Sequence, residues 1–265
     1  MFIEEFMRFI FVILSTLFFI SACVTSETSI TSGGNGIKTS FDPVAAAETR
    51  VKLALLYIEE NQMQQAKQNL DKALEYQPND AQIYRMLAYY YQKVNEDTKA
   101  MDSYKKSISL DSENGDTYNN YGTFLCRKGN YKEAEEVFLK AVKLPNYTRI
   151  SSTYRNAGIC AEEAKDNKKA IFYYQYALSH SPNSHFLNLL LAKLNITEKD
   201  YKAAKSNLFN FQRTSKQTPE SLWQWIRLSY ITGKEASLSK YAGELLDKFP
   251  ESQQALNYLN NEYYD

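Results

Sequence analysis

Few residues in this 265-residue chain have the types and spacing that catalysis requires. The two histidines, His180 and His185, lie on either side of Pro182, and no carboxylate or cysteine stands at metal-ligand spacing from them. The sequence contains no G-x-S-x-G, no glycine-rich phosphate loop and no H-E-x-x-H. We therefore predict that the protein is not an enzyme, needs no metal or cofactor and has no small-molecule substrate. The alternative is a catalytic site built on the surface around a carboxylate such as Glu162.

The charges of the chain also argue against nucleic acid as a partner. The 31 Lys and Arg residues balance the 31 Asp and Glu residues. No basic patch of the kind that binds a phosphate backbone stands out along the sequence. We expect no nucleic acid to bind.

The first of the three cysteines, Cys23, stands at the end of an apolar segment. Residues 9–20 are apolar except for one Ser-Thr pair, a length too short to span a bilayer but suited to the core of a signal peptide. The segment ends in Ile-Ser-Ala-Cys at positions 20–23, which resembles the lipobox of bacterial lipoproteins. The resemblance implies that residues 1–22 are a signal peptide, which is removed, and that Cys23 is lipidated. The alternative is an ordinary signal peptide with a cysteine there by chance.

The same resemblance implies a cellular location. The residue after Cys23 is Val24, not the aspartate that tends to hold lipoproteins of enteric bacteria at the inner membrane. We therefore expect a lipid-anchored protein at the outer membrane of a Gram-negative bacterium, facing the periplasm. Residues 23–40 are rich in Ser, Thr and Gly and are predicted to form a flexible tether. An acidic pair near the start is unusual in a signal peptide and leaves both Met1 and Met7 open as the initiator.

Small and large residues recur along the rest of the chain with a period close to 34. The clearest series consists of five alanines: Ala66, Ala100, Ala134, Ala170 and Ala204. With this alanine numbered as position 20 of each repeat, position 8 is always Ala or Gly. Position 24 is always large: Leu70, Tyr104, Phe138, Tyr174 and Leu208. Small residues where two helices approach, and large residues between them, are typical of helical repeat arrays. The pattern resembles the tetratricopeptide repeat.

This register divides the chain into repeats. They are 47–80, 81–114, 115–148, 151–184 and 185–218, with a degenerate sixth at 219–250 and a cap at 251–265. Two extra residues near 144–147 lengthen the turn between the third and fourth repeats. We expect residues 41–265 to form one all-α, right-handed superhelical solenoid of tetratricopeptide helix-turn-helix repeats, closed by a C-terminal capping helix.

The other two cysteines, Cys126 and Cys160, fall at positions 12 and 10 of the first helices of the third and fourth repeats. Neighbouring first helices of a stacked array come close enough for a disulfide. The periplasm is oxidising, so we predict a bond between them. Two buried free thiols are the alternative, because free cysteine packs as a small hydrophobic residue.

Partner binding is expected on the concave face, which positions 2, 5, 9 and 12 of each first helix should line. An apolar groove is predicted at the amino-terminal end of the array, where it could dock an amphipathic helix or an apolar strand. The predicted groove consists of Val51, Leu55 and Ile58 of the first repeat with Arg85 and Tyr89 of the second. The alternative is that Phe41 and Val44 of the tether fold over the groove and cover it.

The resemblance is narrower than the repeat itself. The segments Y-N-N-Y-G-T-F-L-C at 118–126 and N-A-G-I-C at 156–160, in a lipoprotein of six repeats, resemble the type IV pilus biogenesis and stability family called PilF or PilW. That family acts as a pilotin, which takes the pilus secretin to the outer membrane and supports its multimer assembly. The resemblance implies the secretin subunit as partner and a role in pilus biogenesis. The alternative is a lipoprotein adaptor that recruits periplasmic cell-wall hydrolases or outer-membrane assembly factors.

Overall fold

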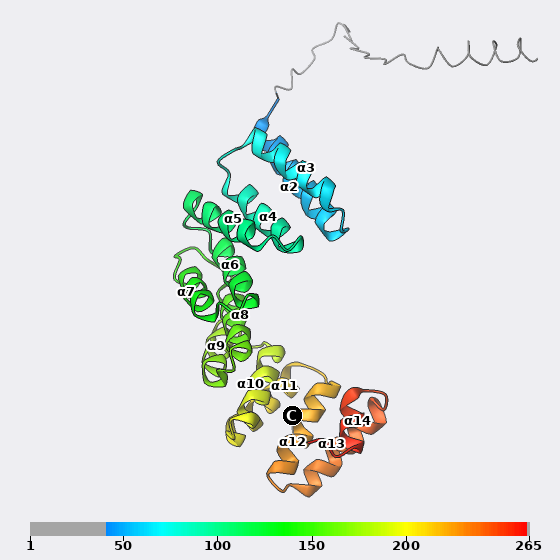
Figure 1. The fold of residues 1–265 in the computed structure, drawn as a ribbon. Helices are drawn as coiled ribbons and strands as arrows, with labels where there is room; N and C mark the ends of the chain where they lie inside the picture. Colours follow the sequence, from blue (N-terminus) through cyan, green and yellow to red (C-terminus); the bar gives the residue numbers. More distant parts are fainter. Residues whose placement is uncertain (1–40, 264–265) are drawn as a thin grey trace, which may run out of the picture. The chain divides into compact units, whose positions relative to one another are not determined.

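The computed structural model describes residues 41–263, and every regular element in this range is an α-helix (Figure 1). The described helices all lie within the unit Asp42–Asp265. They pair in chain order, which confirms the prediction of an all-α tetratricopeptide solenoid. The pairs are α2 (Pro43–Glu59) with α3 (Met63–Tyr76), α4 (Ala81–Lys93) with α5 (Asp97–Leu110), α6 (Gly115–Arg127) with α7 (Tyr131–Val142), α8 (Ile150–Glu163) with α9 (Asn167–His180), α10 (His185–Thr197) with α11 (Tyr201–Thr214), and α12 (Pro219–Ile231) with α13 (Glu235–Lys248), followed by α14 (Gln253–Leu259).

Most repeats begin with a short polar side chain that caps the first helix. The capping residues are Asp42, Asp80, Asn114, Ser184 and Thr218. Each accepts hydrogen bonds from backbone N–H groups that have no partner inside the helix. Helix α8 differs, because Arg149 stands at its cap position and makes no side-chain capping bond. The fourth repeat therefore starts with backbone donors that no side chain caps.

The turn inside each repeat contains one residue with a positive φ, always at position 15. These residues are Asn61, Asn95, Gly129, Lys165, Lys199 and Gly233. Gly and Asn adopt this conformation at little cost, whereas a lysine adopts it against steric resistance from its Cβ. The positive φ at position 15 is thus set by the fold of the repeat and not by the residue type at that position.

Small side chains at position 8 allow the two helices of a repeat to pack closely. In the third and fourth repeats position 8 is glycine, and the aromatic ring at position 24 fills the space beside it. A Cβ on Gly122 would lie 2.7 Å from the Phe138 ring, and one on Gly158 would lie 2.4 Å from the Tyr174 ring. The alanines at position 20 are fully buried in all five repeats that carry them. The periodic residues therefore form the core.

The turn between the third and fourth repeats is longer than the others. It runs over residues 143–149, whereas four residues separate the other described repeats. Tyr147 in this turn packs against the start of α6, where a Cβ on Gly115 would lie 2.3 Å from its ring. The Tyr147 hydroxyl also lies 2.7 Å from the Thr153 hydroxyl of α8. The two extra residues thus add a side chain that ties α6 to α8.

The sixth repeat has the most deeply buried helix of the array. Every residue of α12 from Ser221 to Ser229 is buried. Trp225 stacks on Tyr241 of α13, and Tyr263 stacks on Trp223 and Tyr230 of α12. The Nε of Arg227 donates a hydrogen bond to the Tyr263 carbonyl oxygen at 3.2 Å. The segment after α13 thus closes this end of the array.

None of the described helices is both long enough and apolar enough to span a bilayer.

Candidate protein-binding surface

The apolar groove predicted in the first repeat does not exist in the form that the sequence suggests. Val51 and Ile58 are each only 3% exposed. Val51 belongs to a core cluster that also contains Leu70 of α3 and Leu87 of α4. These two residues lie on the side of α2 that the neighbouring helices cover, so they support the repeat and cannot contact a partner.

Among the apolar side chains of α2 that remain accessible are three at or near the predicted centre or on its flank. Leu55 is partly exposed, Val44 is 50% exposed and Leu56 is 54% exposed. Val44 and Leu55 are eleven residues apart, which places them on one flank of the helix, and Leu56 lies next to Leu55 toward the outside. We call Val44, Leu55 and Leu56 the first-repeat apolar face.

The alternative in which Phe41 and Val44 cover the groove is wrong for Val44. Pro43 at the first position and the Asp42 cap start α2 before Val44, so Val44 is part of the helix itself. Phe41 is 67% exposed. The start of α2 at Pro43 cannot be predicted from the repeat register, because the register begins four residues later, at residue 47.

The two groove residues of the second repeat have partners inside the protein. Arg85 Nη1 donates a hydrogen bond to Asn114 Oδ1 at 3.0 Å, so its guanidinium is tied to the start of the next repeat. The Tyr89 ring is partly exposed, and the Lys93 ammonium lies 5.3 Å from its centre. Tyr89 occupies the same repeat position as Leu55 and adds an aromatic surface beside the first-repeat apolar face.

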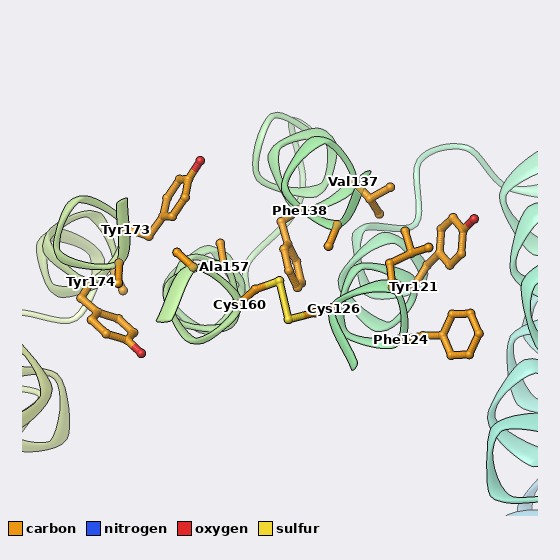
Figure 2. Packing of buried hydrophobic residues seen from close by; sticks show 14 of the residues in the cluster. Tyr121, Phe124, Cys126, Val137, Phe138, Ala157, Cys160, Tyr173 and Tyr174 are labelled. Carbon is orange, nitrogen blue, oxygen red and sulfur yellow. A yellow bond between two sulfur atoms is a disulfide. The ribbon is translucent and has the colours of Figure 1, made fainter. Parts of the chain in front are cut away.

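The third and fourth repeats are joined covalently and by hydrogen bonds. A disulfide links Cys126 of α6 with Cys160 of α8, with their Cα atoms 5.6 Å apart (Figure 2). Asn156 Nδ2 donates to Asn119 Oδ1 at 2.9 Å, and Asn119 is buried. Asn156 is thus a packing residue, as is typical of repeat asparagines, rather than a free amide for a ligand.

A carboxylate also connects these two repeats. Glu135 of α7 accepts hydrogen bonds from the Lys169 ammonium at 2.7 Å and from the Tyr173 hydroxyl, both on α9. Burial alone would raise the pKa of Glu135, but the hydrogen bonds from Lys169 and Tyr173 outweigh it and hold this pKa below its usual value. The joint between these repeats is therefore built for rigidity.

The residues considered for catalysis have structural roles in the described part of the chain. Glu162 accepts a hydrogen bond from the Tyr174 hydroxyl, and burial and this bond raise the pKa of Tyr174, so the phenol stays protonated as the donor. The ring of His180 stacks on Tyr154, and the ring of His185 meets Phe211 edge-on. Within residues 41–263 no group of three metal-ligating side chains is found. Cys23, the predicted signal peptide and the predicted tether lie outside the described residues.

Comparison with known proteins places these features in a family. Models of the tetratricopeptide repeat match residues 47–80, 81–114 and 114–182, which together are more than half of the chain. A Haemophilus influenzae protein described only as uncharacterized is 36% identical over 148 residues, which are 56% of this chain and 77% of that protein. The chain belongs to the tetratricopeptide repeat family.

Two proteins of that family match nearly the whole array. The type IV pilus assembly protein PilF of Pseudomonas aeruginosa is 29% identical over 233 residues, 88% of this chain and 90% of PilF. Its solved structure has a TM-score of 0.67 at 28% identity and covers 83% of this chain and 99% of that chain. A crystal structure of PilW, a type IV pilus biogenesis factor, shares the fold, with a TM-score of 0.66 at 23% identity over 80% of this chain and 98% of PilW. The protein is a PilF/PilW-like tetratricopeptide repeat protein.

Proposed function

We propose that this protein is an outer-membrane pilotin, a lipoprotein that binds the type IV pilus secretin and promotes its localisation and multimer assembly. The observation that carries the proposal is the nearly full-length correspondence with PilF, which includes the sixth repeat and not only the generic repeats.

The accessible surface of the first repeat fits a role in protein binding. Apolar side chains that stay exposed next to a well-packed core are typical of interaction surfaces, and an amphipathic helix or apolar strand could bury them. We infer that the secretin subunit contacts the first-repeat apolar face and the ring of Tyr89. Arg85 is held by Asn114 and is assigned to the packing of the array in this proposal.

The membrane address is part of the same proposal and depends on Cys23. A lipid chain at this residue would hold the array at the outer membrane, and residues 24–40 would give it reach into the periplasm. A partner bound to the array would then be brought to that membrane without any chemistry by the protein itself.

The test is a gene deletion complemented with either the wild-type gene or Cys23→Ser. We expect the deletion to abolish secretin multimers in the outer-membrane fraction, as seen by immunoblot, and to abolish pili. Cys23→Ser should leave the protein soluble or at the inner membrane, with the secretin away from the outer membrane. Normal secretin multimers in the deletion strain, combined with a cell-wall defect, would favour the adaptor alternative and reject the pilotin.

A further inference from the structure

An open recess lies where the fourth repeat meets the fifth, far along the sequence from the first-repeat apolar face. Its volume is about 900 Å³, and it is lined by the turn before α8, the start of α8, the end of α9 and the start of α10. The basic side chains in its wall are Arg149, Arg155 and His180, and none of the described residues that line it is acidic. The recess therefore favours a negatively charged occupant.

Arg155 is the residue that distinguishes this recess. It stands at position 5 of its repeat, as Arg85 does in the second repeat. Arg85 donates to Asn114, the cap of the next first helix, at 3.0 Å. The corresponding cap after Arg155 is Ser184, which is shorter and accepts a hydrogen bond from the Leu187 N–H at 3.3 Å. The arginine at position 5 is thus hydrogen-bonded to the next cap residue in the second repeat, whereas the arginine at position 5 of the fourth repeat lacks that partner.

The hydrogen bonding of the Arg155 side chain also favours a negatively charged occupant. Its Nε is buried and has no hydrogen-bond partner in the described part of the chain. A buried donor of a charged group that stays unpaired is costly, and a carboxylate can satisfy a guanidinium through two parallel hydrogen bonds. Arg155 as a whole is only partly buried and lines the recess, so a carboxylate that pairs with its guanidinium can satisfy the Nε once the side chain shifts.

Two neighbouring features add to the attraction for an anion. The ion pair of Arg149 with Asp116, at 3.2 Å, is exposed, so it is weak and can open toward a ligand. The first N–H groups of α8 belong to Ile150, Ser151 and Ser152, and the helix has no side-chain cap. The hydroxyls of Ser151 and Ser152 already donate to backbone carbonyls, so the backbone N–H groups are the donors that remain for an occupant.

The size of the recess and an exposed aromatic side chain in its wall argue for a peptide rather than a small anion. Phe186 is 48% exposed at the edge. His180, which also lines the recess, stacks on Tyr154 of α8. A phosphate ion would fill only a small part of about 900 Å³. A peptide segment can place a carboxylate on Arg155 and apolar side chains on the rim.

We propose that this recess is a second protein-binding site, which takes an acidic peptide segment flanked by aromatic or aliphatic residues. Arg155 holds the carboxylate, and Phe186 contacts a flanking apolar side chain. The inference does not depend on the proposed pilus role, because its evidence comes from the fourth and fifth repeats alone.

The experiment measures fluorescence anisotropy of two labelled, amidated peptides with the full mature protein. One peptide is Gly-Phe-Glu-Glu-Phe-Gly, and the other has glutamine in place of both glutamates. We expect saturable binding of the acidic peptide and binding of the glutamine peptide that is about tenfold weaker. Arg155→Gln should weaken the acidic peptide about tenfold and leave the glutamine peptide unchanged, which is the signature of a direct pair. Arg85→Gln is the matched control and should bind as the wild type does.

A second variant protects the test against a folding defect. Phe186→Glu changes an exposed rim residue and should also weaken the acidic peptide about tenfold, while thermal melting stays unchanged. The proposal is wrong if the acidic peptide does not bind, if both peptides bind equally, or if Arg155→Gln and Phe186→Glu both bind like the wild type. Displacement of the peptide by an equal concentration of inorganic phosphate would also overturn it, because the recess would then be a simple anion site.

Discussion

Helix α12, near the carboxyl end of the array, is buried on almost every side, whereas α2, at the other end, buries only one. The difference lies in what packs against each helix. Tyr263 and α14 lie over α12, and Tyr263 stacks on two of its aromatic rings. On α2 the residues Ala47, Val51, Ala54 and Ile58 face the core, and the opposite side holds Leu56.

A repeat array can therefore place its stability and its partner binding in different regions. A terminal helix lacks a neighbour on its outer side, so its apolar residues must be capped by the chain or remain available to a partner. The carboxyl end uses the first solution, although α14 still leaves Leu259 59% exposed. At α2, Val44, Leu55 and Leu56 remain available, which is why we assign partner binding to that end.

The largest expected effect tests the closed end. Trp225 is 4% exposed and stacks on Tyr241 at 4.9 Å. We expect Trp225→Ala to cost about 3–5 kcal/mol by opening a cavity, and to lower the melting temperature by about 10 °C. Leu56→Ala should change stability by less than about 0.5 kcal/mol, because its site is exposed. Equal effects of the two variants in thermal melting would remove the distinction between the ends.

The disulfide provides a test of the middle of the array, away from both ends. Cys126 and Cys160 are separated by 34 residues, and closing such a loop stabilises a protein by about 4 kcal/mol in the chain-entropy model. The double variant Cys126→Ser with Cys160→Ser should melt several degrees lower than the oxidised wild type. Reduction of the wild type should give a similar decrease. Partner binding at the first-repeat apolar face should survive, so its loss would contradict the separation of stability from binding.

A smaller effect of opposite sign is expected at Lys165. Its φ of +63° is the left-handed conformation that glycine adopts at the same repeat position in Gly129 and Gly233. Lys165→Gly should raise the free energy of unfolding by about 0.5–1 kcal/mol, because the steric cost of the Cβ disappears. Chemical denaturation of the two proteins measures this difference. A destabilised variant would mean that the lysine makes a contact worth more than its strain.

The smallest effect is a pH dependence at the joint between the third and fourth repeats. Because the pKa of Glu135 is below its usual value in the folded protein, its contribution to stability is present above the unfolded pKa and is lost as the pH falls through the folded pKa. Glu135→Gln should remove this acid-dependent part, so that the difference in melting temperature from the wild type shrinks at low pH. A difference that does not change with pH would assign Glu135 a purely steric role.

The sequence predicts the array well and its surfaces poorly, for a physical reason. Position 8 and position 20 can be read from the chain because close helix packing admits only small residues there, as the contact of Gly158 with Tyr174 shows. The residues that line the groove cannot be predicted in this way, because helical spacing does not reveal which flank of α2 the neighbouring helices cover. Val51 lies on the covered flank.

The recess beside Arg155 could not be predicted from spacing alone. Its preference for an anion depends on Arg155, which lacks the partner that Arg85 has, because Ser184 stands where the second repeat has Asn114. The sequence shows that position 5 is arginine in both the second and the fourth repeat and that position 34 differs between them. Only the folded chain shows that the Nε of Arg155 stays unpaired.

The central claim is that the open end of the array binds the pilus partner, and a direct affinity measurement tests it. Binding of the purified mature protein to its own secretin subunit can be measured by calorimetry for the wild type, Leu56→Glu and Leu259→Glu. The two variants introduce the same charge at similarly exposed leucines, one at each end. We expect Leu56→Glu to weaken binding at least tenfold with unchanged melting, and Leu259→Glu to bind normally. Normal binding by Leu56→Glu, or an equal loss in both variants, would contradict it.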